Sequence, residues 1–126
     1  MLFRSFTIEI LIGDARKLLT NIPIKFDIVY QDAFSPAQNP LLWTAEYFAQ
    51  IRSLIKEDGL LTTYSIAAAV RMGLDENGFK LFIYKGERIR ESMVASPQML
   101  ELEFIDMVLK KQRNPDAKSM RDCDYS

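Results

Sequence analysis

Short apolar runs alternate with amphipathic segments along the chain, a pattern typical of strands separated by helices. The runs rich in β-branched and aromatic residues are predicted to be strands: Phe6–Ile12, Phe26–Tyr30, Leu60–Tyr64, Phe79–Tyr84 and, more weakly, Ser92–Ala95. Helices are predicted between them, each after a residue that can cap its first turn: Ala15–Leu19 after Asp14, Ala45–Ile55 after Thr44, and Ala67 to about Glu76 after Ser65.

Two dipeptides that contain glycine mark where these elements should end. Asp58-Gly59 is predicted to be the turn before the third strand, and Asn77-Gly78 offers the left-handed residue that stops a helix. Strand and helix then alternate as in an α/β sheet with helical crossovers. The last two strands are joined by too few residues for a crossover, so we expect an antiparallel hairpin at the edge of the sheet.

The chain beyond Pro97 gives a weaker signal. The stretch 99–105 alternates like a strand, yet Leu100, Phe104 and Val108 would also share one face of a helix, so periodicity leaves both open. Asn114-Pro115 predicts a short helix to about Arg121. We therefore divide the chain into a domain at 1–96 and a C-terminal arm at 97–126, either a surface arm or an edge element.

Composition narrows the chemistry that this chain can perform. It has 126 residues, a net charge of −1, one cysteine and no histidine. Histidine-dependent triads, His-ligated zinc and an intrachain disulfide are thereby excluded. The charge argues against a generally basic nucleic-acid coat but allows a local basic patch. No apolar run approaches the ~18 residues of a membrane helix and the start is a poor signal peptide, so we expect no membrane association and a cytoplasmic protein.

Polar residues follow three of the predicted strands. Ligands of open parallel sheets bind beyond the carboxyl ends of the strands, which here means Gly13-Asp14, Asp32 and Ser65. Carboxylates placed there could hold a nucleoside-like ligand and its reaction partner, although helix caps and turns are the more frequent use of such residues. The five glycines form neither a GxGxxG motif nor a P-loop, and no metal-binding spacing is present, so we expect no metal.

Two further segments are candidates for binding. Residues 32–43 (DAFSPAQNPLLW) place Phe34, Pro36 and Trp43 after a strand, either as a stacking wall for a flat base or as a rigid loop with its rings packed inward. A basic rim for phosphates could be formed by Lys85, Arg88 and Arg90, with Arg71 nearby. Glutamates at 87 and 91 interleave with these cations, so a solvated, salt-bridging loop is the more frequent outcome.

Read together, several segments resemble one family. These are GDARKLL at 13–19, FDIVYQDAFSPAQNPLLWT at 26–44, GLLTTYSIAAAVRMGL at 59–74 and NGFKL at 77–81. They resemble the methyltransferase domain of MnmC-like proteins, which modify the wobble uridine of certain tRNAs. The similarity covers roughly 8–96, and the DAFSPAxNPxxW segment is its specific part.

This resemblance implies a Rossmann-like class I fold and an S-adenosylmethionine-dependent transfer of methyl to the aminomethyl group on C5 of that uridine. It implies that the anticodon stem-loop of tRNA is the substrate, with possible coupling to an oxidoreductase. Gly13, Asp14 and Ala15 would contact the cofactor, and Asp32 would lie beside both the methyl donor and the accepting amine. The remaining implied contacts are to the substrate: Phe34, Pro36, Tyr64, Ser65, Arg71, Lys85, Arg88 and Arg90.

The chain departs from the family at its start. Only twelve residues precede Gly13, so the family's glycine-rich first motif has no counterpart. We expect the fold to begin at about the third strand, which exposes the facing edges of Phe6–Ile12 and Phe26–Tyr30. A longer chain, direct pairing of the two strands or a homodimer could cover them. By itself the chain should bind the cofactor weakly. The alternative functions are a non-catalytic α/β module and a small-molecule N-methyltransferase.

Overall fold

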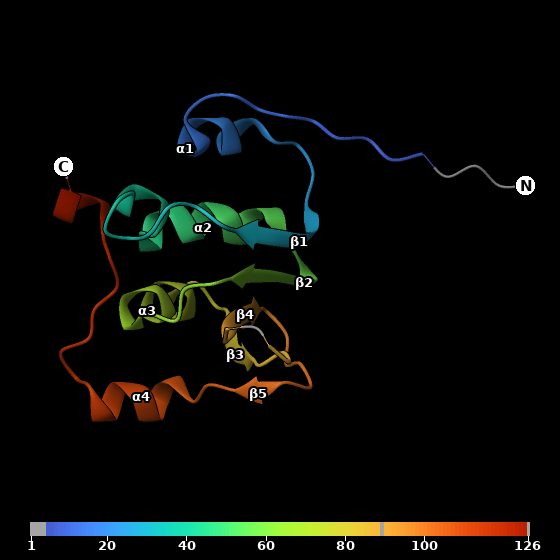
Figure 1. Cartoon of the computed structure of the whole chain (residues 1–126). Coiled ribbons are helices and arrows are strands. Elements are labelled where there is room, and N and C mark those ends of the chain that lie inside the picture. The colour runs from blue at the N-terminus through green and yellow to red at the C-terminus, as the bar shows by residue number, and fades with distance from the viewer. Residues whose placement is uncertain (1–4, 89, 126) are drawn as a thin grey trace, which may run out of the picture.

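A single sheet organises the chain in the computed structural model, which describes residues 5–88 and 90–125 (Figure 1). The sheet has five strands in the order β1-β2-β4-β3-β5. Their bounds are β1 Phe26–Gln31, β2 Ile55–Thr63, β3 Lys80–Tyr84, β4 Ser92–Ser96 and β5 Glu103–Phe104. The expected α/β fold with an antiparallel hairpin is confirmed.

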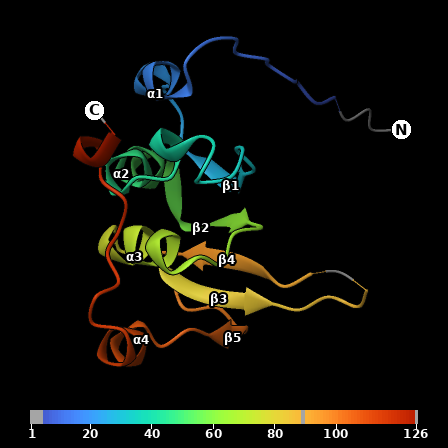
Figure 2. The same cartoon turned by 60° about the vertical axis from the view of Figure 1, so that its left-hand side comes forward.

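Helices lie along one side of this sheet, as Figure 2 shows for α2, α3 and α4. The α-helices are α1 Ala15–Leu18, α2 Ala45–Leu54, α3 Ala68–Glu76 and α4 Met107–Arg113. Short 3-10 helices span Leu19–Asn21, Pro40–Leu42 and Asp122–Tyr125. Buried side chains of α2 and α3, among them Phe48 and Leu74, pack against Leu61 and Leu81 of the sheet. No helix in the described part of the chain is long and apolar enough to span a membrane.

The caps predicted for the first two helices are confirmed. The Asp14 carboxylate accepts a hydrogen bond from the Arg16 amide at 3.0 Å, and the Thr44 hydroxyl accepts one from the Tyr47 amide. At α3 the prediction is wrong by two positions, because Ala67 is the N-cap and makes no side-chain cap bond. Gly78 ends that helix with a φ of 82°, as expected of a left-handed stop.

The turn predicted at Asp58-Gly59 is wrong, because both residues belong to β2. The parallel pairing with β1 shifts register there: Phe26 faces Ile55, but Ile28 faces Leu60. The extra residues of β2 form an irregularity that keeps β2 against β1. A Cβ on Gly59 would lie 2.9 Å from the backbone oxygen of Asp27, so glycine permits this close approach.

The closing hairpin lies inside the sheet rather than at its edge, which corrects the expectation. β4 pairs with both β2 and β3, and β5 adds to the far side of β3, where Phe82 faces Phe104. The cause lies in the tertiary structure, because placing β4 between β2 and β3 lets both edges of β4 form hydrogen bonds. The central position buries Met93 and Ala95 completely.

The strand predicted for Phe6–Ile12 is wrong. Residues 5–12 have no regular secondary structure, and large apolar side chains are open to solvent, with Ile12 91% and Phe6 85% exposed. Among the described residues no strand lies beside this segment, and β1 is left as an edge strand. A strand without a partner leaves its backbone groups unpaired, so a β-prone sequence stays irregular.

The C-terminal segment is both an edge element and an arm. It supplies β5 and α4, and residues after α4 run without a helix to the amino end of α2, where the Ala45 amide donates to Met120 O at 2.8 Å. The helix predicted from Asn114-Pro115 to Arg121 is therefore wrong. Burial of Ser119 and Met120 holds that stretch in an extended path.

Candidate functional site

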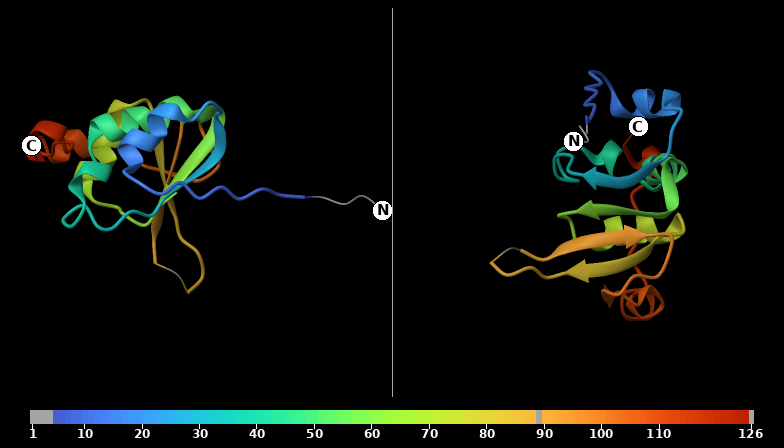
Figure 3. Two further views of the ribbon diagram at one scale, coloured as in Figure 1. Left: turned by 90° about the horizontal axis from the view of Figure 1, so that it is seen from above. Right: turned by 90° about the vertical axis from the view of Figure 1, so that its right-hand side faces the viewer.

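The carboxyl ends of β1 and β2 lie next to each other at one edge of the sheet. The last paired residues of the two strands are Gln31 and Thr63, which face each other. Asp32 and Tyr64 directly follow them and therefore lie at neighbouring strand ends. Figure 3 shows that the loop between β3 and β4 projects beyond this same edge. Two of the predicted strand ends are thus brought together, as expected of a parallel pair.

Hydrogen bonds hold the loop 32–43 in place above β1. Buried Gln31 donates from Nε2 to Leu42 O at 2.6 Å, and Trp43 donates from Nε1 to Phe34 O at 2.7 Å. Arg16 of α1 adds a bond to Leu41 O at 3.2 Å. The loop is therefore fixed near its start and at its end by side chains from the strand, the loop itself and α1.

An aromatic contact joins this loop to the end of β2. The Trp43 and Tyr64 rings meet edge to face with centroids 5.8 Å apart, and the Tyr64 hydroxyl donates to Ala33 O at 2.8 Å. Edge-to-face pairs of this kind add to the energy of burial alone. The contact fixes the spacing between the two strand ends.

The predicted alternatives for the aromatic residues of the loop both occur, each for a different residue. Trp43 is fully buried and packs inward, whereas Phe34 is 75% exposed and Tyr64 45% exposed. Pro36 is half-buried beside them in the loop. The buried indole thus supports a surface on which two rings remain open to a ligand.

Asp32 is the first residue of the loop that carries Phe34. Its side chain is exposed, and the hydrogen bonds and ion pairs of the described residues give its carboxylate no partner. An unpartnered carboxylate between a strand end and exposed rings can accept hydrogen bonds from an amine or hydroxyl. The structure therefore leaves the Asp32 carboxylate open to solvent directly after the end of β1.

The segment Gly13–Ala15 approaches the same side of the molecule. In Figure 1 the amino end of α1 and the carboxyl end of β1 face the same way. Gly13 has a φ of 147°, and Asp14 is exposed while capping α1. The capping role expected from the sequence is real, and it leaves the second carboxylate oxygen of Asp14 without a bond in the described structure.

Ser65 is mainly structural. It is buried, and its hydroxyl accepts a long hydrogen bond of 3.4 Å from the Ala67 amide. Its own amide donates to the Thr63 hydroxyl, also at 3.4 Å. These contacts shape the turn between β2 and α3 rather than present the hydroxyl to solvent.

The expected basic rim divides into two parts. In the loop beyond β3, Lys85 is paired with Glu91 at 3.4 Å and with Glu103 at 3.8 Å, while Arg88 and Arg90 are exposed. Arg71 instead lines a pocket between α3 and α4 together with Lys110. Lys110 was not predicted from the sequence, because periodicity did not decide between helix and strand in the segment before it.

The expected cofactor fits the described residues in part. Asp32 and Asp14 offer exposed carboxylates on one side of the molecule, which can accept hydrogen bonds from an amine or from ribose hydroxyls. The described glycines at 13, 59, 73, 78 and 86 form no phosphate- or methionine-cradling loop. Asp14 and Asp32 would thus hold one side of S-adenosylmethionine.

Comparison with known proteins agrees with this geometry. Residues 2–98 match the family described as S-adenosyl-L-methionine-dependent methyltransferase. The tRNA 5-methylaminomethyl-2-thiouridine biosynthesis bifunctional protein MnmC of Ralstonia nicotianae is 41% identical over 75 residues, which are 60% of this chain and 11% of that protein. The chain thus spans only a small part of this relative. The match confirms the resemblance found in the sequence.

Solved structures show the same fold. MNMC2 from Aquifex aeolicus superimposes with a TM-score of 0.81 at 35% identity, over 92% of this chain and 39% of that one. A probable spermidine synthase from Corynebacterium glutamicum has a TM-score of 0.61 at 18% identity, over 89% and 53% of the two chains. The second likeness shows the fold alone. The chain has the Rossmann-like methyltransferase fold and belongs to the S-adenosyl-L-methionine-dependent methyltransferase family.

Proposed function

We propose that this chain provides the acceptor side of a tRNA N-methyltransferase and acts as part of a longer chain. The reaction would transfer a methyl group to the aminomethyl substituent on C5 of the wobble uridine. The observation that carries the proposal is the open carboxylate of Asp32 beside the exposed rings of Phe34 and Tyr64. The match to MnmC relatives supports tRNA as the substrate class.

Each of these groups has a distinct role. When bound, S-adenosylmethionine would supply an electrophilic methyl group on a sulfonium, and the carbon–sulfur bond that breaks would leave the sulfur as a neutral thioether. The Asp32 carboxylate accepts a hydrogen bond from the amine and takes the proton that the nitrogen loses on forming its bond to carbon. Phe34 and Tyr64 stack on the uracil ring, and the loop held by Trp43 keeps them in register with Asp32. Alignment of two reactants in this way can contribute about 7–11 kcal/mol.

The proposal is tested with a chain extended at its start by the corresponding segment of the Ralstonia relative. Methyl transfer to tRNA lacking the final modification is expected, and Asp32→Asn should abolish it. Asp58→Asn is the matched control, because Asp58 is also exposed but lies in β2 away from the carboxyl edge. Transfer that survives in Asp32→Asn, or no transfer by a folded wild-type chain, would overturn the proposal.

The isolated chain gives a second measurement. Because its described residues hold only one side of the cofactor, calorimetry should show weak binding of S-adenosylmethionine or none. Micromolar affinity would contradict this division of the site.

A small-molecule N-methyltransferase is the competing function. The observation that favours it is the pairing of Lys85 with carboxylates, because a paired lysine contributes less to phosphate binding. With Lys85 neutralised by two glutamates, Arg88 and Arg90 are the exposed cations left in the hairpin loop. Reversal of both charges should lower tRNA methylation if RNA is the substrate. Activity on an amine without RNA, unaffected by this reversal, would support the small-molecule function instead.

A further inference from the structure

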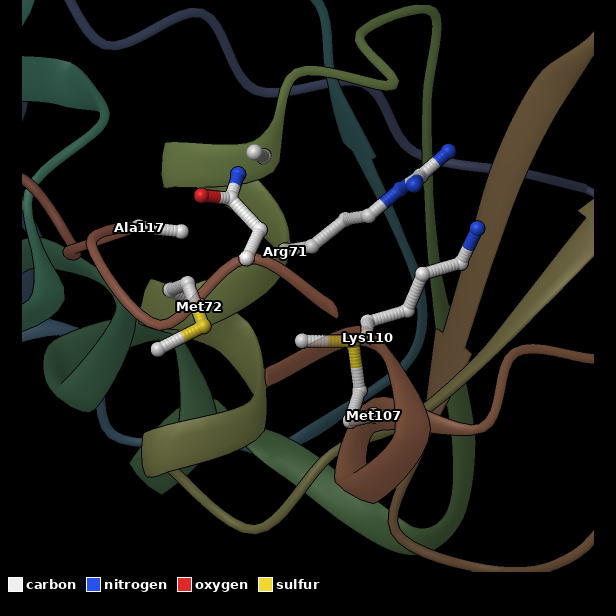
Figure 4. Close-up of a pocket in the computed structure, with 7 residues that line it drawn as sticks. Arg71, Met72, Met107, Lys110 and Ala117 are labelled. Carbon is white, nitrogen blue, oxygen red and sulfur yellow. The ribbon is translucent and has the colours of Figure 1, made fainter. Parts of the chain in front are cut away.

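A pocket between α3 and α4 joins two cations that the fold brings from distant parts of the sequence. It is lined by Ala68, Arg71, Met72, Met107, Lys110, Asn114 and Ala117, and its volume is about 140 Å³. Figure 4 shows the nitrogen ends of Arg71 and Lys110 pointing to the same side of the pocket. No carboxylate is among the lining residues of this part of the structure.

The two cations of the pocket have no carboxylate partner among the described residues. Arg71 Nε is buried and has no hydrogen-bond partner, which is costly for a charged group. Within the described residues neither Arg71 nor Lys110 forms an ion pair, whereas the adjacent Lys111 binds Asp75 at 2.6 Å. Asn114 adds a side-chain amide to the lining. The pocket therefore offers positively charged hydrogen-bond donors and, among its described lining residues, no carboxylate to pair with them.

A phosphate group matches these donors in charge, geometry and size. A guanidinium binds phosphate oxygens through paired N–H groups, and an ammonium adds a point charge. A water molecule needs roughly 10–15 Å³ measured in the same way, so the tetrahedral oxygens of one phosphate fit within the pocket. The apolar walls from Met72 and Met107 exclude part of the solvent and strengthen the interaction.

The position of the pocket selects an RNA backbone as the source of this phosphate. Arg71 lies in the first turn of α3, and α3 begins three residues after Ser65. Chain geometry therefore places the Cα atoms of Arg71 and Ser65 within roughly 15 Å of each other. We propose that the pocket formed by Arg71, Lys110 and Asn114 binds a backbone phosphate of the RNA whose base lies at Asp32. This rests on the proposed function, because it takes RNA as the substrate.

The test measures binding of the 126-residue chain to a fluorescent anticodon stem-loop at several salt concentrations, without cofactor. Arg71→Gln and Lys110→Gln should each weaken binding about three- to tenfold and reduce the salt slope by about 1, because one phosphate contact is lost. Lys111→Gln is the matched control on the same helix and should change affinity less than twofold. Equal losses in Lys110→Gln and Lys111→Gln would overturn the proposal, since a general positive field would explain both.

A second readout identifies the source of the anion and does not depend on affinity changes. The Arg71 Nε–H signal in a ¹H–¹⁵N spectrum should shift on adding the stem-loop and, at higher concentration, inorganic phosphate. A shift with phosphate but not with RNA would overturn the RNA assignment and leave a site for free phosphate. An unmoved signal with both would overturn the site. Stem-loop binding with these effects but no methyl transfer by the extended chain would reject only the proposed function.

Discussion

Replacing Trp43 by phenylalanine should loosen the loop that carries Asp32 and Phe34. Trp43 is fully buried, donates from Nε1 to Phe34 O at 2.7 Å, and contacts the rings of Phe48 and Tyr64 edge to face. Phenylalanine keeps one ring but has no N–H and fills less space. The loop then loses the bond that ties its end to its start, while Asp32 itself is unchanged.

The expected cost follows from these contacts. The hydrogen bond contributes about 1 kcal/mol, and the cavity left by the smaller ring adds roughly 1–2 kcal/mol. A loss of about 2–3 kcal/mol is a large fraction of the roughly 5–15 kcal/mol that is typical of a domain. In the extended chain, misplacement of the loop should also lower methyl transfer.

Urea unfolding measures this loss. Circular dichroism is the signal to follow, because Trp43 is the chain's one tryptophan and the variant has no tryptophan fluorescence. Hydrogen exchange at residues 33–42 should accelerate in the variant. Tyr64→Phe is the milder comparison: it keeps the ring contact and removes only the bond to Ala33 O, so it should cost about 1 kcal/mol or less. A loss below about 0.5 kcal/mol for Trp43→Phe, with unchanged exchange, would refute the anchoring role.

Other predictions concern the scaffold. The Arg16 guanidinium, with bonds of 2.5 and 2.6 Å, lowers the pKa of the Asp122 carboxyl, so stability from this pair is present above pH ~4 and is lost as acid protonates Asp122. Asp122→Asn should flatten the fall in unfolding free energy between about pH 5 and 2, and an unchanged profile would contradict the pairing. Gly59→Ala should lower the free energy of unfolding by about 1–3 kcal/mol, because the added Cβ would lie 2.9 Å from Asp27 O. A variant that unfolds at the same urea midpoint as the wild type would argue against this close approach. If a homodimer covers the exposed apolar start of the chain, sedimentation should give two chains for the wild type and one for Ile10→Lys, and a wild-type monomer would reject that dimer.

Local features of the fold could be predicted from the sequence because their causes are local. The caps at Asp14 and Thr44 depend on side chains that reach an amide two or three residues away. The stop at Gly78 depends on one residue's φ. The apolar run at Phe26–Tyr30 predicted β1 because strand periodicity is a property of adjacent residues.

The candidate site was predictable to the extent that it depends on strand ends. Asp32 follows a strand in sequence, and parallel pairing with β2 brings Tyr64 beside it. Which ring of the loop faces solvent was not predictable. Phe34 and Trp43 are both aromatic, and only the packing of Trp43 against Phe48 and Tyr64 determines that the indole is buried.

The sequence by itself thus determined the caps of α1 and α2, β1 and the hairpin, since each is encoded in a short contiguous stretch, and it indicated the family through four such stretches. Only the tertiary structure decided that Phe6–Ile12 remains unpaired, that β4 enters between β2 and β3, and that Arg71 meets Lys110. These outcomes depend on a partner distant in sequence. A β-prone segment forms a strand only where another edge supplies its hydrogen bonds, and two cations share a pocket only where packed helices place them there.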